Sequence, residues 1–127
     1  MSNTLTQRIR VRCESYFVPE RSSQNENLYY FGYRIRITNE GMEPVQLISR
    51  HWTITDGLGK VEEVRGPGVV GQQPRLDAGE TFEYTSACPL HTSYGTMQGR
   101  YRMARDDGST FHAEITPFEM IVPAVLN

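Results

Sequence analysis

Residues 8–14 read RIRVRCE, and residues 28–38 read LYYFGYRIRIT. Polar and apolar residues alternate through both stretches, and successive side chains of an extended strand point to opposite faces. The first stretch therefore places Ile9, Val11 and Cys13 on one face. The second stretch does the same with five apolar residues: Tyr29, Phe31, Tyr33, Ile35 and Ile37. This period of two predicts half-buried β-strands and an all-β fold.

The same pattern recurs along the chain, at residues 45–55, 60–65, 81–86, 97–103 and 111–116. Turn signals such as Asp56-Gly57 and Asp107-Gly108 separate these strands, and no segment keeps a helical period for more than a turn or two. About seven short strands joined by short turns are typical of an antiparallel β-sandwich. A β-barrel is the alternative.

The strand at residues 45–55 has apolar residues on both faces. Strict alternation places Ile48, Trp52 and Ile54 on one face and Val45 and Leu47 on the other, which is expected of a central strand. We therefore predict that Trp52 is buried between the two sheets, where a large ring fills the space between them.

Two segments lack alternation, at residues 66–79 and roughly 87–96, and both are predicted to be loops. Glycines and prolines fill the first segment, so it is expected to be an ordered connection with no helix after Gly71. Loops on a rigid scaffold often carry recognition. The expected binding surface is the end of the sandwich that carries residues 65–75, with the second loop beside it.

The 127 residues, with a net charge of -2, suit a single domain spanning residues 1–127. No apolar stretch approaches the roughly 18–20 residues of a membrane span, so no membrane partner is expected. No broad basic field attracts nucleic acid. The first residues, MSNTLTQRIRVR, lack the apolar core of a secretory signal, and a cytoplasmic protein is expected.

The two cysteines, Cys13 and Cys88, are far apart and form no metal-binding pair. In a cytoplasmic protein both are expected to be reduced and unpaired. Cys13 continues the apolar face of its strand, so it is expected to be a small core residue.

Residues 66–71, GPGVVG, satisfy the spacing GxGxxG of dinucleotide-binding folds. That motif works at the start of a helix, and the following Gln-Gln-Pro sequence disfavours a helix here. Backbone N–H groups of a glycine loop can still form an anion-binding nest. The candidate ligand-binding residues are therefore the loop glycines and the flanking arginines: Arg65, Gly66, Gly68, Gly71 and Arg75. The alternative is a turn that needs glycine only for its backbone conformation.

Arginines form three stripes at alternate positions: Arg8, Arg10 and Arg12, then Arg34 and Arg36, then Arg100 and Arg102. If these strands are neighbours, they form a cationic face suited to carboxylate or phosphate. Pairing with the glutamates on the strands is the simpler interpretation.

Recognisable catalytic and metal motifs are absent from the sequence. His51, His91 and His112 form no HxH or HExxH pattern, and no GxSxG elbow or spaced carboxylate pair occurs. We therefore expect no catalytic residues, no metal site and no cofactor.

Four stretches resemble the ApaG family in their order and spacing. They read RHWTITD at 50–56, VRGPGVVGQQP at 64–74, AGETFEYTS at 78–86 and GTMQGRY at 95–101. The resemblance implies a fibronectin type III-like, immunoglobulin-like sandwich in a small bacterial protein. It also implies a gene often found beside that of a diadenosine tetraphosphate hydrolase and a genetic link to cobalt and magnesium resistance or efflux. Related eukaryotic domains look like binding modules.

The leading hypothesis is a non-enzymatic domain that binds an unidentified protein or a small anionic metabolite. The alternative is a nucleotide or pyrophosphate sensor that uses the glycine loop at residues 66–71. Direct handling of divalent metal is a third hypothesis, which the ligand pattern does not support. The sequence does not address the oligomeric state.

Overall fold

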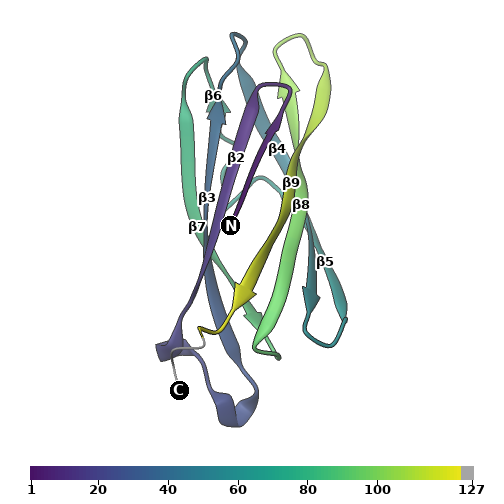
Figure 1. Ribbon diagram of the computed structural model, residues 1–127. Helices are drawn as coiled ribbons and strands as arrows, with labels where there is room; N and C mark the ends of the chain where they lie inside the picture. Colours follow the sequence, from purple (N-terminus) through teal and green to yellow (C-terminus); the bar gives the residue numbers. More distant parts are fainter. Residues whose placement is uncertain (124–127) are drawn as a thin grey trace.

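Two antiparallel sheets face each other in the computed structural model (Figure 1), which describes residues 1–123. The first sheet has the strand order β1-β2-β3-β7, and the second has the order β5-β4-β8-β9, with β6 also pairing with β4. The strands of the first sheet are β1 (Ser2–Thr6), β2 (Ile9–Phe17), β3 (Tyr29–Asn39) and β7 (Thr81–Leu90). Those of the second are β4 (Val45–Asp56), β5 (Val61–Pro67), β6 (Arg75–Leu76), β8 (Tyr94–Arg105) and β9 (Thr110–Ile121).

The predicted antiparallel β-sandwich is confirmed, with nine strands in the described residues instead of about seven. The two additional strands are the short β1 and β6, because neither carries enough alternating residues to show a period. Two 3-10 turns, at Pro19–Arg21 and Gln24–Glu26, lie between β2 and β3. Residues 124–127, at the end of the predicted 1–127 domain, lie outside the described residues.

Both predicted loops are shorter than expected. Gly66 and Pro67 end β5, and Arg75 and Leu76 form β6, so the connection between these strands covers only residues 68–74. Pro67 pairs with Ser49, which an edge strand allows because one side of it has no neighbour. In the second segment, β7 continues to Leu90 and β8 begins at Tyr94.

The core lies between the sheets and follows the predicted alternation in β2 and β3. Ile9, Val11 and Cys13 are buried, and so are Phe31, Tyr33, Ile35 and Ile37. Trp52 is also buried, as predicted. Its ring centroid lies 5.7 Å from that of Tyr33 in the opposite sheet and 6.1 Å from that of Tyr101 in its own sheet. The tryptophan therefore links the two layers.

A β-bulge in β4 changes which of its side chains face the core. The register with β8 shifts between Leu47 and Ser49, so that one additional residue interrupts the alternation. Val45, Leu47, Trp52 and Ile54 consequently all point into the core, and Ile48 is half-buried. The predicted division of these residues between two faces was wrong, since alternation across a bulge does not hold.

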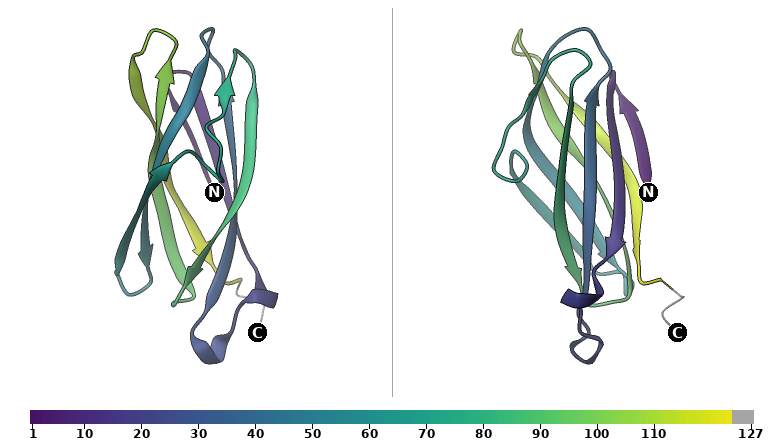
Figure 2. Two further views of the ribbon diagram at one scale, coloured as in Figure 1. Left: turned by 180° about the vertical axis from the view of Figure 1, so that it is seen from behind. Right: turned by 90° about the vertical axis from the view of Figure 1, so that its left-hand side faces the viewer.

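The two open sides of the sandwich are covered differently. On one side β1 lies along β9, and the Thr4 and Thr116 hydroxyl oxygens are 2.7 Å apart. On the other side the connection after β5 curls across the gap before the chain reaches β7 (Figure 2). Val69 of this connection is fully buried. Val69 therefore closes that side of the core.

No helix in the described residues is long and apolar enough to cross a membrane. Cys13 and Cys88 are separate, buried thiols. Burial raises the pKa of each thiol to about 11, because the thiolate would lose its hydration. The position of Cys13 in the core is as predicted.

Candidate functional site

The outer face of the second sheet collects basic residues from several strands. Tyr101 and Met103 of β8 point into the core, so the alternating Arg100 and Arg102 point outward. On either side of Arg100 the register places His51 of β4 and Glu114 of β9. Arg102 likewise lies opposite Ser49 of β4 and His112 of β9, and Arg65 of β5 lies opposite His51.

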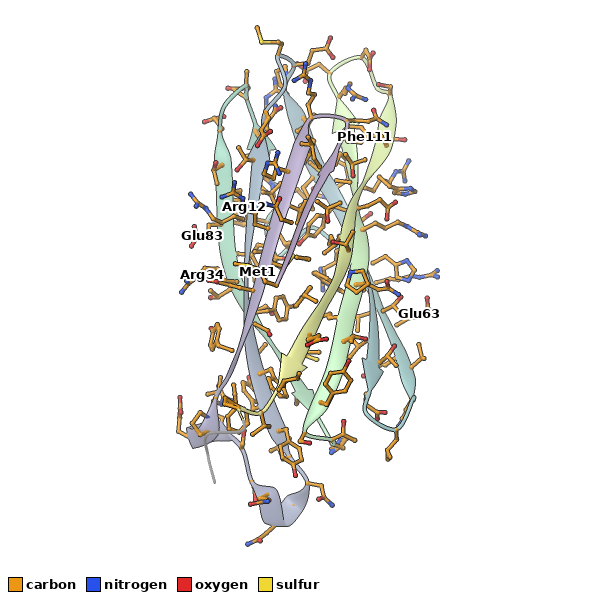
Figure 3. All side chains as sticks on the ribbon, viewed as in Figure 1. Met1, Arg12, Arg34, Glu63, Glu83 and Phe111 are labelled. Carbon is orange, nitrogen blue, oxygen red and sulfur yellow. The ribbon has the colours of Figure 1, made fainter. Side chains whose placement is uncertain are left out.

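These side chains surround an open hollow of about 550 Å³, which we call the arginine–histidine hollow. Its lining includes four arginines and two histidines and no carboxylate: Arg50, His51, Arg65, Arg100, Arg102 and His112. The other lining residues are Ile48, Ser49, Gly66, Pro67 and Gln73. In Figure 3 nitrogen-tipped side chains project from this side of the sandwich, where Glu63 is labelled.

The hollow exists because short residues lie among long ones. Ser49, Gly66 and Pro67 are short residues of its lining, and the arginines are the long ones. A side chain at Gly66 would meet the Arg50 guanidinium, with its Cβ only 3.1 Å from Nη1. Arg50 Nη1 donates to the carbonyls of Pro67 and Gly68, both at 2.9 Å. Arg50 therefore anchors the start of the connection after β5.

Glu63 lies beside the hollow and compensates part of its charge. Its Oε1 lies 2.8 Å from His51 Nε2 and 3.7 Å from Arg65 Nη2. The hydrogen bond from His51, followed by the positive charge of Arg65, lowers the pKa of Glu63. The carboxylate is therefore ionised at neutral pH and holds His51 in place.

Arg100 and Arg102 are different, because neither forms an ion pair with any carboxylate in residues 1–123. This holds even though Glu114 lies opposite Arg100 in the register. Both arginines are exposed. Each keeps its full set of N–H donors for a ligand, and guanidinium donors match the geometry of carboxylate and phosphate oxygens.

The predicted ligand-binding residues do not come together in one place. Arg65 and Gly66 line the arginine–histidine hollow. Arg75 belongs to β6 and lies opposite Gln46 of β4. Its Nη2 donates to Asp106 Oδ2 at 2.9 Å. That hydrogen bond lowers the pKa of Asp106, so Arg75 already has an anionic partner.

The glycine loop is a tight hairpin. Val70 and Gly71 have φ angles of +43° and +80°, and the Val69 and Gln72 backbones bond to each other at 2.8 and 2.9 Å. Positive φ at both central residues identifies a type I′ turn, which favours glycine. The Gly68 N–H donates to the Ile48 carbonyl at 2.8 Å. Three amides near the motif are therefore occupied, and the chain continues into β6 without a helix, as predicted.

Four residues of the hollow were not predicted to lie together in one site: Arg100, Arg102, His51 and His112. The Arg100 and Arg102 stripe was visible, but its neighbours were not. The other two arginine stripes lie on the opposite sheet, where Arg12 pairs with Arg36 in the register. The alternate positions of Arg100 and Arg102 were the only signal in the sequence, because the register that decides their neighbours is not visible there.

Metal and nucleophile chemistry have little support in the described residues. No three His, Cys, Asp or Glu side chains gather where they could hold a metal ion in residues 1–123. The Tyr84 and Tyr101 hydroxyls bond to each other in the core. Burial raises the pKa of both phenols, which keeps them neutral at physiological pH.

Comparison with known proteins agrees with the resemblance of the four sequence stretches. Residues 19–105 match the family model of the ApaG domain. The chain is 53% identical to Protein ApaG of Anaeromyxobacter dehalogenans and to Protein ApaG of Aromatoleum aromaticum, over the full length of both chains in each case. A crystal structure of a Bordetella pertussis protein described as ApaA superimposes with a TM-score of 0.90 at 49% identity, covering 95% of this chain and 98% of that one. The chain belongs to the ApaG family.

Proposed function

We propose that this protein is a non-enzymatic binding module whose arginine–histidine hollow receives an anionic group of a protein or small-molecule partner. The observation that carries the proposal is the lining of the hollow, with four arginines, two histidines and no carboxylate. A concave surface with one sign of charge concentrates ions of the opposite sign. The expected location is the cytoplasm, which suits two free thiols.

Arg100 and Arg102 supply the specific contacts. Their guanidinium groups project from a strand paired on both sides, so the sheet holds their Cα atoms in place. Binding an anion still costs the rotamer freedom of both side chains, so the charge-assisted hydrogen bonds must outweigh that loss. Because both side chains are exposed, the attraction is screened by salt, and affinity should fall as ionic strength rises.

A hydrolytic function has less support than binding. Ser49 and His51 both line the hollow, and His51 contacts Glu63, which resembles a Ser-His-acid arrangement. However, alternate residues of a strand are separated by roughly 6.5–7 Å along the backbone. No hydrogen bond joins the Ser49 hydroxyl to His51 in residues 1–123, where the side-chain hydrogen bond of His51 runs from Nε2 to Glu63.

The link of the family to cobalt and magnesium resistance is better explained by an indirect role. A hollow lined by guanidinium groups repels divalent cations, and magnesium prefers clustered carboxylates. We infer that any effect on metal ions acts through the bound partner or metabolite.

Nucleotide or pyrophosphate binding by the glycine loop is the alternative. The occupied amides around Gly68 and Val69 make that loop a poorer anion site than the arginines beside it. Gly66 lines the arginine–histidine hollow, so a phosphate bound in the hollow would still lie beside the first glycine of the GxGxxG motif.

A backbone NMR titration with pyrophosphate, ATP and succinate tests the proposal. We expect shifts at Arg100, Arg102 and Gly66 that saturate below about 1 mM, a binding free energy of roughly -4 kcal/mol. Arg100→Gln with Arg102→Gln should remove them, whereas Arg34→Gln with Arg36→Gln on the other sheet should not. Shifts restricted to Gly68 and Gly71 would favour the glycine loop. No shift at several millimolar of any anion would overturn the proposal.

A further inference from the structure

The two unpaired arginines of the arginine–histidine hollow and His112 lie on neighbouring strands. Arg100 and Arg102 occupy alternate positions of β8 and line the same hollow. His112 lies directly across from Arg102 on β9, and cross-strand neighbours on one face are within roughly 4.5–5.5 Å at Cβ. Ser49 lies across from Arg102 on the other side, and its short side chain leaves room above the sheet. Arg100, Arg102 and His112 therefore contribute donors to one part of the hollow, whose lining contains no carboxylate, while Glu114 of β9 lies across from Arg100 outside that lining.

We propose that this part of the hollow recognises the phosphate group of a small phosphorylated molecule in preference to a carboxylate. The inference rests on the proposed anion-binding function and names its ligand class. A phosphate monoester carries about -1.5 to -2 charges at neutral pH and has three terminal oxygens. A carboxylate carries one charge on two oxygens. The two unpaired guanidinium groups match the larger charge, and the imidazole N–H of His112 offers a donor to the third oxygen.

The remainder of the hollow accommodates an organic group attached to the phosphate. Its volume of about 550 Å³ lies within the range of roughly 300–1,000 Å³ that is typical of small-molecule sites. Away from β9, the lining changes to Ile48, Pro67 and Gln73. Gln73 Nε2 donates to the Ile48 carbonyl at 2.9 Å, which holds that amide at the edge of the hollow. Apolar and amide groups there suit the uncharged part of a metabolite.

Titration calorimetry with glycerol 3-phosphate, glycerate and inorganic phosphate tests this ligand class. We expect glycerol 3-phosphate to bind about tenfold more tightly than glycerate, because charge-assisted hydrogen bonds to a dianion are stronger. Inorganic phosphate, which lacks the organic group, should bind more weakly than glycerol 3-phosphate. Arg102→Lys keeps the charge but removes the planar fork, so it should reduce the preference for phosphate over glycerate. Arg36→Lys on the other sheet is the matched control.

The outcomes separate this inference from the proposed function. Equal affinity for glycerol 3-phosphate and glycerate would overturn the phosphate preference and leave anion binding intact. If pyrophosphate binds but neither of these compounds does, the assignment to a phosphorylated metabolite is overturned and anion binding stays intact. If none of the three binds, both are overturned. A short phosphoserine peptide that binds tenfold or more tightly than glycerol 3-phosphate would overturn the assignment to a small molecule. An unchanged preference for glycerol 3-phosphate over glycerate in Arg102→Lys would overturn the assignment of phosphate recognition to Arg102.

Discussion

Both outer faces of the sandwich carry arginines at alternate positions, but the residues around those arginines differ between the two faces. On the four-stranded sheet, Arg34 lies 3.0 Å from Glu14 and 3.6 Å from Glu83, and Arg36 lies 3.3 Å from Glu83. Figure 3 shows Arg12, Arg34 and Glu83 together on this face. A smaller hollow of about 270 Å³ on this face therefore has glutamates among its arginines.

On the five-stranded sheet the arginine–histidine hollow has no carboxylate in its lining. Exposed ion pairs contribute little to stability, typically about 0–1 kcal/mol. We therefore expect the difference between the faces to influence the proposed anion binding more than folding. An arginine stripe is a candidate site only where its side chains form no ion pair.

Both sheets pack against one core, and substitution of Trp52 tests whether that core stabilises both. Its ring contacts Tyr33 beneath the four-stranded sheet and Tyr101 beneath the five-stranded sheet. We expect Trp52→Ala to lower the free energy of unfolding by about 3–5 kcal/mol, because it leaves a large cavity. Urea unfolding measures this loss, with the neighbouring Thr53→Ala as the control. A loss below about 1 kcal/mol would contradict a shared core.

Thiol labelling tests how closed the four-stranded face is. Cys13 borders the smaller hollow on that face but is only 1% exposed. With burial raising the pKa of Cys13 and Cys88 to about 11, alkylation of the native protein at pH 8 should be at least about a hundredfold slower than in the unfolded chain.

Intact-mass analysis should show two labels in denatured protein without reductant and none in briefly treated native protein. Rapid native labelling of Cys13 would mean that the smaller hollow opens to the core. Absence of labelling after denaturation would mean that the two thiols are not free.

Removing the glutamates should convert the four-stranded face into an anion site. Glu14→Gln with Glu83→Gln leaves Arg12, Arg34 and Arg36 around the smaller hollow without a carboxylate. We expect affinity for pyrophosphate at this face to increase about tenfold, as the arginines gain free donors. NMR shifts of residues 34–36 report it, and Glu119→Gln is the control. An unchanged affinity would show that pairing does not explain the difference between the faces.

Acid titration gives the smallest expected effect. Arg10 lowers the pKa of Glu40 beside the four-stranded sheet, and His51 lowers that of Glu63 on the five-stranded sheet. A carboxylate with a lowered folded pKa stabilises the protein above its unfolded value, 4.5 for glutamate, and loses this contribution as pH falls through the folded value. The melting temperature should therefore fall slightly as the pH drops below the unfolded value of 4.5, because both carboxylates are exposed and each contributes little.

Glu40→Gln and Glu63→Gln should each make this decline shallower, since each removes one titrating group. The exposed Glu20→Gln is the comparison variant. A melting temperature that rises toward pH 3 would have the wrong sign for both carboxylates.

The sequence predicted the sandwich because its strongest signal is local. Alternation in β2 and β3 depends only on neighbouring residues and on the geometry of an extended chain. Burial of Trp52 followed in the same way. The faces of Val45 and Leu47 could not be predicted, because the bulge near Ile48 exists only when β4 pairs with β8. The strands β1 and β6 were missed, since pairing partners, not periodicity, define such short segments.

The candidate site likewise has features that follow from the sequence and features that follow only from the fold. The sequence by itself determined which residues carry charge, that Arg100 and Arg102 share a face, and that Gly71 suits a turn with positive φ. Only the tertiary structure decided that β4, β8 and β9 are neighbours, which brings His51 and His112 beside those arginines and sends Arg75 to Asp106. Contacts between strands depend on sheet order, and sheet order is a property of the whole folded chain that no single segment contains.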